Sequence, residues 1–195
     1  MSAAARLIVV CALVVGLGGH VAVAQSPRGL VVAVVDFYAP GVLPPVEGII
    51  PEDLAADDLT TLLARGAGTG IRVLPREAVR QAESAMAWQR SDVLRFARRR
   101  ELGRAVGADR LLIGWIERLD LDRGGGGGGA GNQAGRHAMS GFAAIRVQVF
   151  DVAQGRIVSE VQQSGYEQGV ISGGVTARLL LHLLERIVPS LLPAP

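Results

Sequence analysis

The chain has 195 residues with 20 basic and 18 acidic side chains, which leaves a formal net charge of +2. This balance argues against a nucleic-acid partner, because nucleic-acid-binding domains carry a clear excess of basic residues. The one cysteine, Cys11, lies in the apolar amino-terminal stretch. The rest of the chain therefore has no disulfide, no thiolate metal ligand and no thiol nucleophile.

The first 24 residues have the features of a secretory signal peptide. Arg6 supplies a positive charge, residues 7–17 are apolar, and residues 22–24 (Ala-Val-Ala) form a small-x-small cleavage site. The apolar run is short for a membrane span, which needs about 20 residues, and glycines interrupt it. We therefore expect cleavage after Ala24 and no transmembrane segment in the mature chain.

Cys11 does not turn this segment into a lipoprotein signal. A lipobox has a small residue directly before its cysteine, whereas Val10 precedes Cys11 and the apolar stretch ahead of it is short. We therefore expect a periplasmic or secreted protein without a lipid anchor. Residues 25–195 are predicted to form a single domain, which is long enough for a core of its own.

Strand and helix patterns alternate in the first half of the chain. Residues 30–35 are continuously apolar, as in a buried strand. Pro51 begins a helix that ends at Gly66, and acidic residues in its first turn suit the positive end of the helix dipole. The further elements predicted here are a strand at 71–74, a helix at 75–88, and a helix at 91–106 capped by Ser91-Asp92 and ended by Gly107.

The second half predicts three consecutive strands, at 110–122, 142–151 and 156–162. The first of them is apolar on both faces, so we expect it in the middle of the sheet. Gly155 is predicted to take a positive φ in the turn before the last strand. The glycine-rich insert 123–140 is expected to be flexible.

The chain is predicted to end in a long helix that packs on the sheet. Ser172 is its expected cap and Pro189 its expected end. Val175, Leu179, Leu183 and Ile187 form its apolar stripe. The order βαβααβββα predicts an α/β (α+β) fold with a single mixed β-sheet covered by helices.

Few residues point to catalysis. Asp36 ends the first strand, where a carboxylate can bind a metal or ligand or can accept nearby backbone amides, and a hydrolase using Asp36 with Asp151 is a further alternative. His137 and His182 have no second ligand at metal-binding spacing. We therefore predict no catalytic residues, no cofactor and no metal site.

Arginines crowd the predicted helix at 91–106. They are Arg95, Arg98, Arg99, Arg100 and Arg104. They form either a solvated helix face near the negative dipole end, a docking surface for an acidic partner, or a site for an anionic polymer.

Several motifs, taken in order, resemble the curli-secretion lipoprotein (CsgG-like) superfamily. They are an opening strand at 31–37 (Val-Val-Ala-Val-Val-Asp-Phe), a helix at 53–63, the segment 73–77 (Val-Leu-Pro-Arg-Glu), a strand entry at 105–114 (Ala-Val-Gly-Ala-Asp-Arg-Leu-Leu-Ile-Gly) and a strand turn at 149–158. In this superfamily we include the TolB amino-terminal domain, the FlgO-like flagellar proteins and the lipoprotein activators of penicillin-binding proteins.

The resemblance implies a periplasmic α/β domain that binds protein partners or assembles, with no catalytic residue to carry over. The insert at 123–140 lacks alternating apolar residues, so we do not expect it to line a membrane pore. The leading hypothesis is a non-enzymatic periplasmic accessory protein that docks to a cell-envelope partner. The alternative is an exported ligand- or anionic-polymer-binding protein that uses the arginine-rich helix, and a homo-oligomer is left open.

Overall fold

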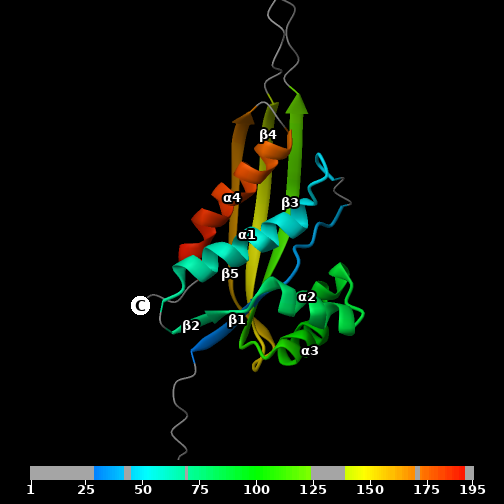
Figure 1. Ribbon diagram of the computed structural model, residues 1–195, viewed down its shortest axis with the longest axis vertical. Helices are drawn as coiled ribbons and strands as arrows, with labels where there is room; N and C mark the ends of the chain where they lie inside the picture. Colours follow the sequence, from blue (N-terminus) through cyan, green and yellow to red (C-terminus); the bar gives the residue numbers. More distant parts are fainter. Residues whose placement is uncertain (1–28, 42–44, 69, 124–138, 170–171, 192–195) are drawn as a thin grey trace, which may run out of the picture.

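The computed structural model describes residues 29–41, 45–68, 70–123, 139–169 and 172–191. The elements in chain order are β1 (Leu30–Val34), α1 (Pro51–Gly66), β2 (Ile71–Val73), α2 (Arg76–Ala85), a 3-10 helix (Arg90–Leu94), α3 (Phe96–Val106), β3 (Arg110–Arg123), β4 (Met139–Asp151), β5 (Arg156–Gly169) and α4 (Ser172–Leu191). The strands form one mixed sheet in the order β2-β1-β3-β4-β5 (Figure 1). This confirms the predicted fold class.

The sheet combines a parallel half and an antiparallel half. β1 runs parallel to both β2 and β3, while β3, β4 and β5 form an antiparallel meander. Gly155 lies in the turn between β4 and β5 with a φ of 66°, as predicted. β3 is the central strand, which explains why both of its faces are apolar.

One face of the sheet is covered by α1 and α4. The predicted stripe of α4, which includes Val175, Leu179, Leu183 and Ile187, is buried against this face. Ile145 and Val147 of β4 and Leu59 of α1 complete the same core. The prediction of the buried side of α4 from the i, i+4 spacing of its apolar residues is therefore confirmed.

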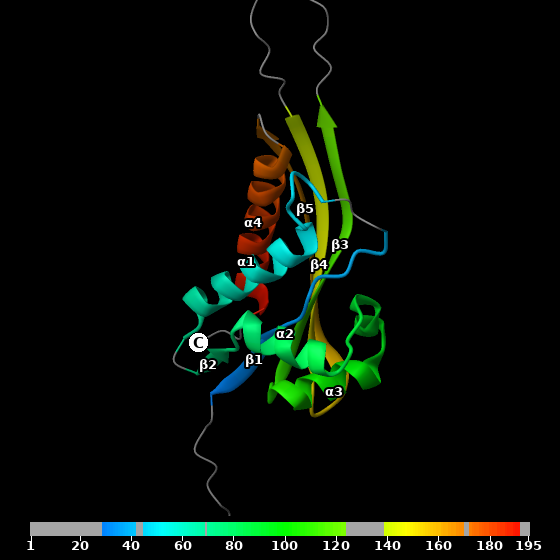
Figure 2. The same ribbon diagram turned by 45° about the vertical axis from the view of Figure 1, so that its right-hand side comes forward.

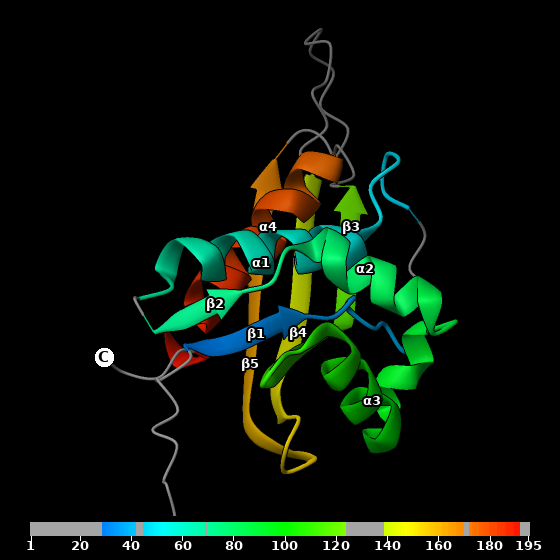
Figure 3. The same ribbon diagram turned by 60° about the horizontal axis from the view of Figure 1, so that its bottom comes forward.

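The other face is covered only in part. α2, the 3-10 helix and α3 pack against β1 and the first half of β3, with Val79, Val93 and Leu102 in a second core. Figure 3 shows β1 between α1 and α3. Figure 2 shows β3 and β4 extending well beyond α2 and α3. The distal half of this face is therefore not covered by any helix of the described residues.

The predicted helix at 91–106 is two elements. Residues Arg90–Leu94 form a 3-10 helix, and α3 begins only at Phe96. The Asp92 side chain does not cap α3; it accepts the backbone N–H of Gln89 at 3.1 Å, in a capping box of the 3-10 helix. Ser91 and Asp92 therefore mark the start of the 3-10 helix and not the start of α3. As predicted, α3 ends at Gly107, which has a φ of 68°.

Two predictions about α4 are wrong in detail. Pro189 lies inside the helix, which continues to Leu191. Proline removes one hydrogen bond to an exposed carbonyl near the helix end, while Leu191 still packs against the core and holds the last turn. At the other end Ser172 is the first helical residue and donates to Glu47, whose carboxylate also accepts the N–H of Gly173 at 3.0 Å.

Some predictions fall outside the described residues. These are the signal peptide with its cleavage after Ala24, Cys11, His137 and the glycine-rich residues 124–138. The two ends of the insert predicted at 123–140 do belong to strands, because β3 extends to Arg123 and β4 begins at Met139.

Candidate interaction surface

The arginines predicted as an interaction surface do not share one environment. Arg95 is 74% exposed, and Arg104 is also exposed. Arg98 is 25% exposed and forms ion pairs with Asp92 and Glu101. Arg100 is partly buried and donates to the carbonyl oxygen of Gln154 at 3.2 Å. Arg95 and Arg104 are thus the two exposed arginines, although Arg95 also lies 3.7 Å from the carboxylate of Asp92.

Arg99 is not on the surface at all, which corrects the prediction for this residue. It is 4% exposed, and its guanidinium carbon lies 4.8 Å from the Phe96 ring centroid and 5.7 Å from that of Phe150. Its side chain donates to the carbonyl oxygen of Val93 and to Gln148. Burial, and then the positive charge of Arg146, lower the pKa of Arg99 to about 10.

The inward direction of Arg99 had a signal in the sequence. Leu102 and Gly103 follow it at i+3 and i+4 and are both buried on the sheet side of α3. Gly103 is needed there because a β-carbon would lie 2.4 Å from a methyl group of Val152. Gly103 therefore allows α3 to pack closely, and Arg99 lies on the same buried side of the helix.

Trp115 lies between two arginines, Arg99 at 5.6 Å and Arg146 at 4.8 Å from its ring. It is 5% exposed, as expected for a core residue. Arg146 continues outward to Glu117 at 2.9 Å and Glu160 at 3.6 Å. A row of stacked and paired side chains thus leads from beneath α3 to the uncovered part of the sheet.

We call this uncovered part the open sheet face; it comprises Glu117, Arg118, Phe142, Arg146, Gln162 and Tyr166. The rings of Phe142 and Tyr166 lie 4.8 Å apart, and Tyr166 is 79% exposed, the highest value among the exposed large hydrophobic residues that the structure describes. Arg118 lies over the Phe142 ring at 5.1 Å. Arg146 and Gln148 of β4 alternate with apolar residues in the sequence, which indicates a polar face, but this pattern does not show that aromatic rings from two strands gather there.

The charged groups of the open sheet face hold one another in place. Gln162 donates to Glu117 at 2.6 Å, and Glu117 in turn pairs with Arg146. Arg118 pairs with Asp120 on its own strand. The surface therefore presents an aromatic pair within an ordered frame of ion pairs.

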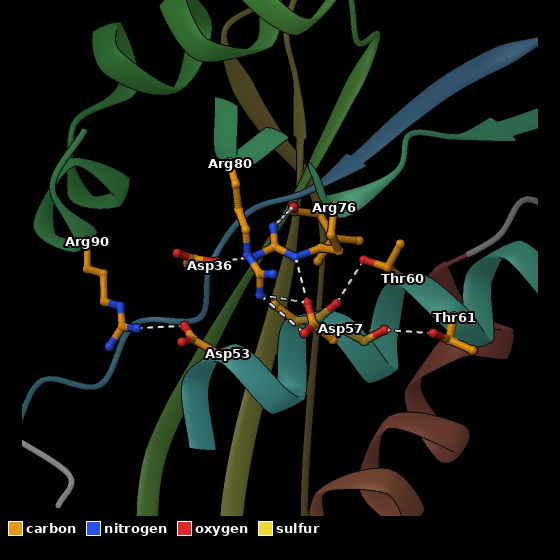
Figure 4. Close-up of polar contacts among 10 residues, drawn as sticks. Asp36, Asp53, Asp57, Thr60, Thr61, Arg76, Arg80 and Arg90 are labelled. Atoms are coloured by element: carbon orange, nitrogen blue, oxygen red, sulfur yellow. Dashed lines mark hydrogen bonds and ion pairs between the residues drawn. The ribbon is translucent and has the colours of Figure 1, made fainter. Parts of the chain in front are cut away.

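A second cluster joins α1, α2 and the segment after β1 (Figure 4). Asp36 forms an ion pair with Arg76, which is 8% exposed and also donates to the carbonyl oxygen of Val34 at 2.7 Å. Asp57 accepts from Arg76 at 3.2 Å and from Arg80 at 2.9 Å. Asp36 is therefore neither open to a ligand nor held only by backbone amides, the two alternatives that the sequence left.

Glu83 is buried beside this cluster. It is 7% exposed, and it accepts the backbone N–H of Asp36. Burial, and then the negative charge of Asp36, raise its pKa to about 7, although Arg76 acts in the opposite direction. Glu83 therefore titrates near neutral pH, and no pattern in the sequence singled it out.

The structure does not bring Asp36 and Asp151 together. Arg110 of β3 lies opposite Asp151, and Leu112 of the same strand lies opposite Val34. Asp36 follows Val34 by two residues, so it lies about 13 Å further along the strands than Asp151. Asp151 pairs with Arg110 and accepts the N–H of Gln154 at 2.6 Å. Burial alone would raise the pKa of Asp151, but these contacts outweigh it and lower the pKa.

His182 is 56% exposed and lies 3.2 Å from Glu167. In the ranges that the structure covers, no three His, Cys, Asp or Glu side chains are grouped as metal ligands. No helix in those ranges is long and apolar enough to cross a membrane.

These elements define an α/β domain with a five-stranded mixed sheet, one face covered by α1 and α4 and one half-open face. No family model matches the chain, and none of the curated proteins matches it in sequence. Solved structures do match. The lipoprotein GNA1162 from Neisseria meningitidis superposes with a TM-score of 0.54 at 13% identity, over 82% of this chain and 99% of that one.

Two further structures are similar at lower scores. The PelC dodecamer from Paraburkholderia phytofirmans has a TM-score of 0.49 at 17% identity, over 86% of this chain and 91% of that one. The LpoB C-terminal domain from Salmonella enterica has a TM-score of 0.43 at 18% identity, over 71% of this chain and 83% of that one. Identities this low establish a likeness of fold alone. A fold similar to that of the lipoprotein GNA1162 is confirmed, whereas the narrower curli-secretion resemblance stays a prediction.

Proposed function

We propose that this chain is an exported, non-enzymatic accessory protein of the cell envelope that acts by docking to a partner protein. The open sheet face carries the proposal. Half of one side of the sheet is left without a helix, and Tyr166 stands on it with 79% of its surface exposed. An exposed, organised aromatic surface of this kind is typical of a protein interaction site.

The chemistry of the open sheet face suits protein recognition. Tyrosine and arginine dominate the binding energy of protein interfaces, because each offers a large apolar area together with hydrogen-bonding groups. Here Arg146 is held by Glu117 and Glu160 before any partner arrives. Binding then costs less side-chain entropy than it would for free arginines.

The location in the envelope comes from two independent expectations. The first is the signal-peptide pattern of residues 1–24. The second is the fold likeness to a protein described as a lipoprotein, from which we extend the location in the envelope, but not the lipid anchor, to this chain as part of the proposal. The resemblance to the curli-secretion superfamily agrees with both.

The non-enzymatic part of the proposal is supported by the state of the carboxylates considered for catalysis. Asp36 is engaged by Arg76 and Asp151 by Arg110. Each carboxylate is thus occupied by a structural ion pair at a separate place in the fold.

The experiment that tests docking is site-specific photo-crosslinking in intact envelopes. A photoreactive residue is placed at Gln162 on the open sheet face, at Arg104 on the arginine-rich helix, and at Arg65 on the exposed end of α1 as a control. We expect a discrete crosslinked protein from Gln162 and none from Arg65. Capture only through Arg104 would move the interaction to the helix, and crosslinking to glycan at Arg104 would favour the polymer-binding alternative.

A further inference from the structure

A groove runs along the free edge of the sheet, between β5 and α4. Its volume is about 460 Å³. Leu179 and Leu183 of α4 form its apolar base together with Gly165 of β5, and His182 and Arg186 stand on its rim. Figure 1 shows β5 as the outer strand, with α4 lying across it.

The absence of a side chain at position 165 keeps this groove open. A β-carbon on Gly165 would lie 3.2 Å from a methyl group of Leu183. Any larger side chain would fill the space over the two leucines. The groove therefore lies over the two leucines, each of which keeps 2% of its surface exposed.

The edge of β5 offers main-chain hydrogen-bonding groups. Among the described residues β5 pairs with β4 alone. The carbonyl oxygen of Gln168 accepts from Arg178 of α4 at 3.2 Å, so it points away from β4. In an antiparallel strand the N–H and C=O of one residue point to the same side, and this side alternates along the strand. The main-chain groups of Gln162, Ser164 and Tyr166 therefore point outward as well.

This edge has few of the features that normally protect sheet edges from pairing. β5 is 14 residues long, its sequence contains no proline and no lysine, and its one irregularity lies near the start, opposite Val149 and Phe150. Natural edge strands are usually short, or carry proline, lysine or bulges that prevent another strand from adding. A long regular edge beside an apolar groove is an acceptor for a further strand.

We propose that the groove between β5 and α4 binds an extended segment of another polypeptide as an additional strand. The occupant must be a polypeptide, because only a main chain supplies donors and acceptors at the spacing of the β5 edge. One of its apolar side chains, of valine or leucine size, lies over Leu179 and Leu183 beside Gly165. Alternate side chains of the segment point to the opposite side and remain solvated.

The inference deepens the proposed function, on which it rests for the existence of a partner, but it concerns the edge of β5 and the groove beside α4, which adjoin the open sheet face at Tyr166. It is tested with purified protein and peptides, so its failure is separate from failure of envelope crosslinking at Gln162. A groove that binds peptides without any crosslink from Gln162 would overturn only the role of the open sheet face.

The first measurement uses three acetylated, amidated peptides of about nine residues, which alternate valine or leucine with arginine, glutamate or serine. Nine extended residues span about 30 Å, enough to cover the outward part of the edge. We expect at least one peptide to bind with a Kd of about 100 µM or tighter in calorimetry. N-methylation of alternate peptide nitrogens in one register should abolish binding, while the same modification in the other register should be tolerated. Equal binding of both methylated forms, or no binding below about 1 mM, would overturn the proposal.

The second measurement changes the protein. Ser164→Pro removes one outward N–H without removing a hydrogen bond to β4, and edge strands tolerate proline in such positions. Ser164→Ala is the matched control, because it keeps the N–H. We expect at least about a tenfold weaker Kd for Ser164→Pro and an unchanged Kd for Ser164→Ala, with both variants melting cooperatively. Unchanged binding by a folded Ser164→Pro, or a β5-to-β5 homodimer in crosslinking, would contradict the proposal; should the proline variant fail to fold, the methylated peptides decide.

Discussion

Asp36 and Arg76 form an ion pair between two segments that lie 40 positions apart in the sequence. Asp36 follows β1, and Arg76 is the first residue of α2. These residues belong to two of the motifs on which the family resemblance rests. Their contact gives both motifs one structural explanation, because the pair fixes the start of α2 against the end of β1.

Removing Arg76 should therefore destabilise the fold. Arg76→Ala leaves Asp36 and Glu83 as neighbouring carboxylates in a buried setting, and breaking such a pair costs about 3 kcal/mol of unfolding free energy. The matched control is Arg80→Ala, since Arg80 is 41% exposed and pairs with Asp57, which is 47% exposed. Its loss should cost less than about 1 kcal/mol. Chemical denaturation measures both, and equal effects would contradict the structural role of Arg76.

The raised pKa of Glu83 predicts a specific pH dependence. Its pKa is 4.5 when unperturbed and about 7 in the folded protein, so the folded state holds its proton more tightly than the unfolded state. Stability from this group is then fully present below pH 4.5 and is lost as the pH rises to about 7. The loss approaches about 3 kcal/mol, at 1.36 kcal/mol for each pKa unit.

Glu83→Gln isolates this effect, because it keeps the shape and cannot ionise. We expect the unfolding free energy of the variant to exceed that of the wild type by an amount that grows between pH 5 and pH 8. Denaturation curves at several pH values measure this difference. A difference that stays constant with pH would show that Glu83 ionises normally.

Arg99 is predicted to be replaceable by an apolar side chain of similar length. It is 4% exposed, and in the described part of the chain it has no acidic partner, so its charge is held inside at a cost. Arg99→Met should change the unfolding free energy by less than about 1 kcal/mol. Arg99→Ala should cost about 2–4 kcal/mol, since it leaves a cavity among three aromatic rings. If both variants lose the same stability, the guanidinium itself is required.

Two helical glycines provide a matched test of close packing. In α3, a β-carbon at Gly103 would lie 2.4 Å from a Val152 methyl group, so Gly103→Ala should cost about 1–3 kcal/mol. In α4, the nearest atom to a β-carbon at Gly174 is 3.7 Å away, on Arg178. Gly174→Ala should be neutral or stabilise the helix by up to about 1 kcal/mol. In thermal melts, Gly103→Ala should therefore lower the melting temperature, whereas Gly174→Ala should raise it or leave it unchanged.

The sequence was sufficient for the elements whose signal is local. The apolar run of β1, the alternation in β4 and the stripe of α4 each record burial directly in the spacing of residues. The left-handed glycines at 107 and 155 were also predictable, because few other residues adopt that conformation readily. Boundaries failed where a tertiary contact decided them, as at Pro189 and in the 3-10 helix before α3.

The candidate sites needed the tertiary structure. The aromatic pair joins Phe142 and Tyr166 from two strands, and the groove joins β5 to α4, so neither exists in any single segment of sequence. The sequence does not distinguish the five arginines at 95–104, yet Arg99 is buried, Arg98 is ion-paired, Arg100 contacts the turn at Gln154, and Arg95 and Arg104 are exposed. By itself the sequence determined which residues are apolar, at what period, and hence the class of fold. Only the packing of α3 and α4 on the sheet decided which charges are buried and which surfaces stay open, because burial depends on neighbours that are distant in the chain.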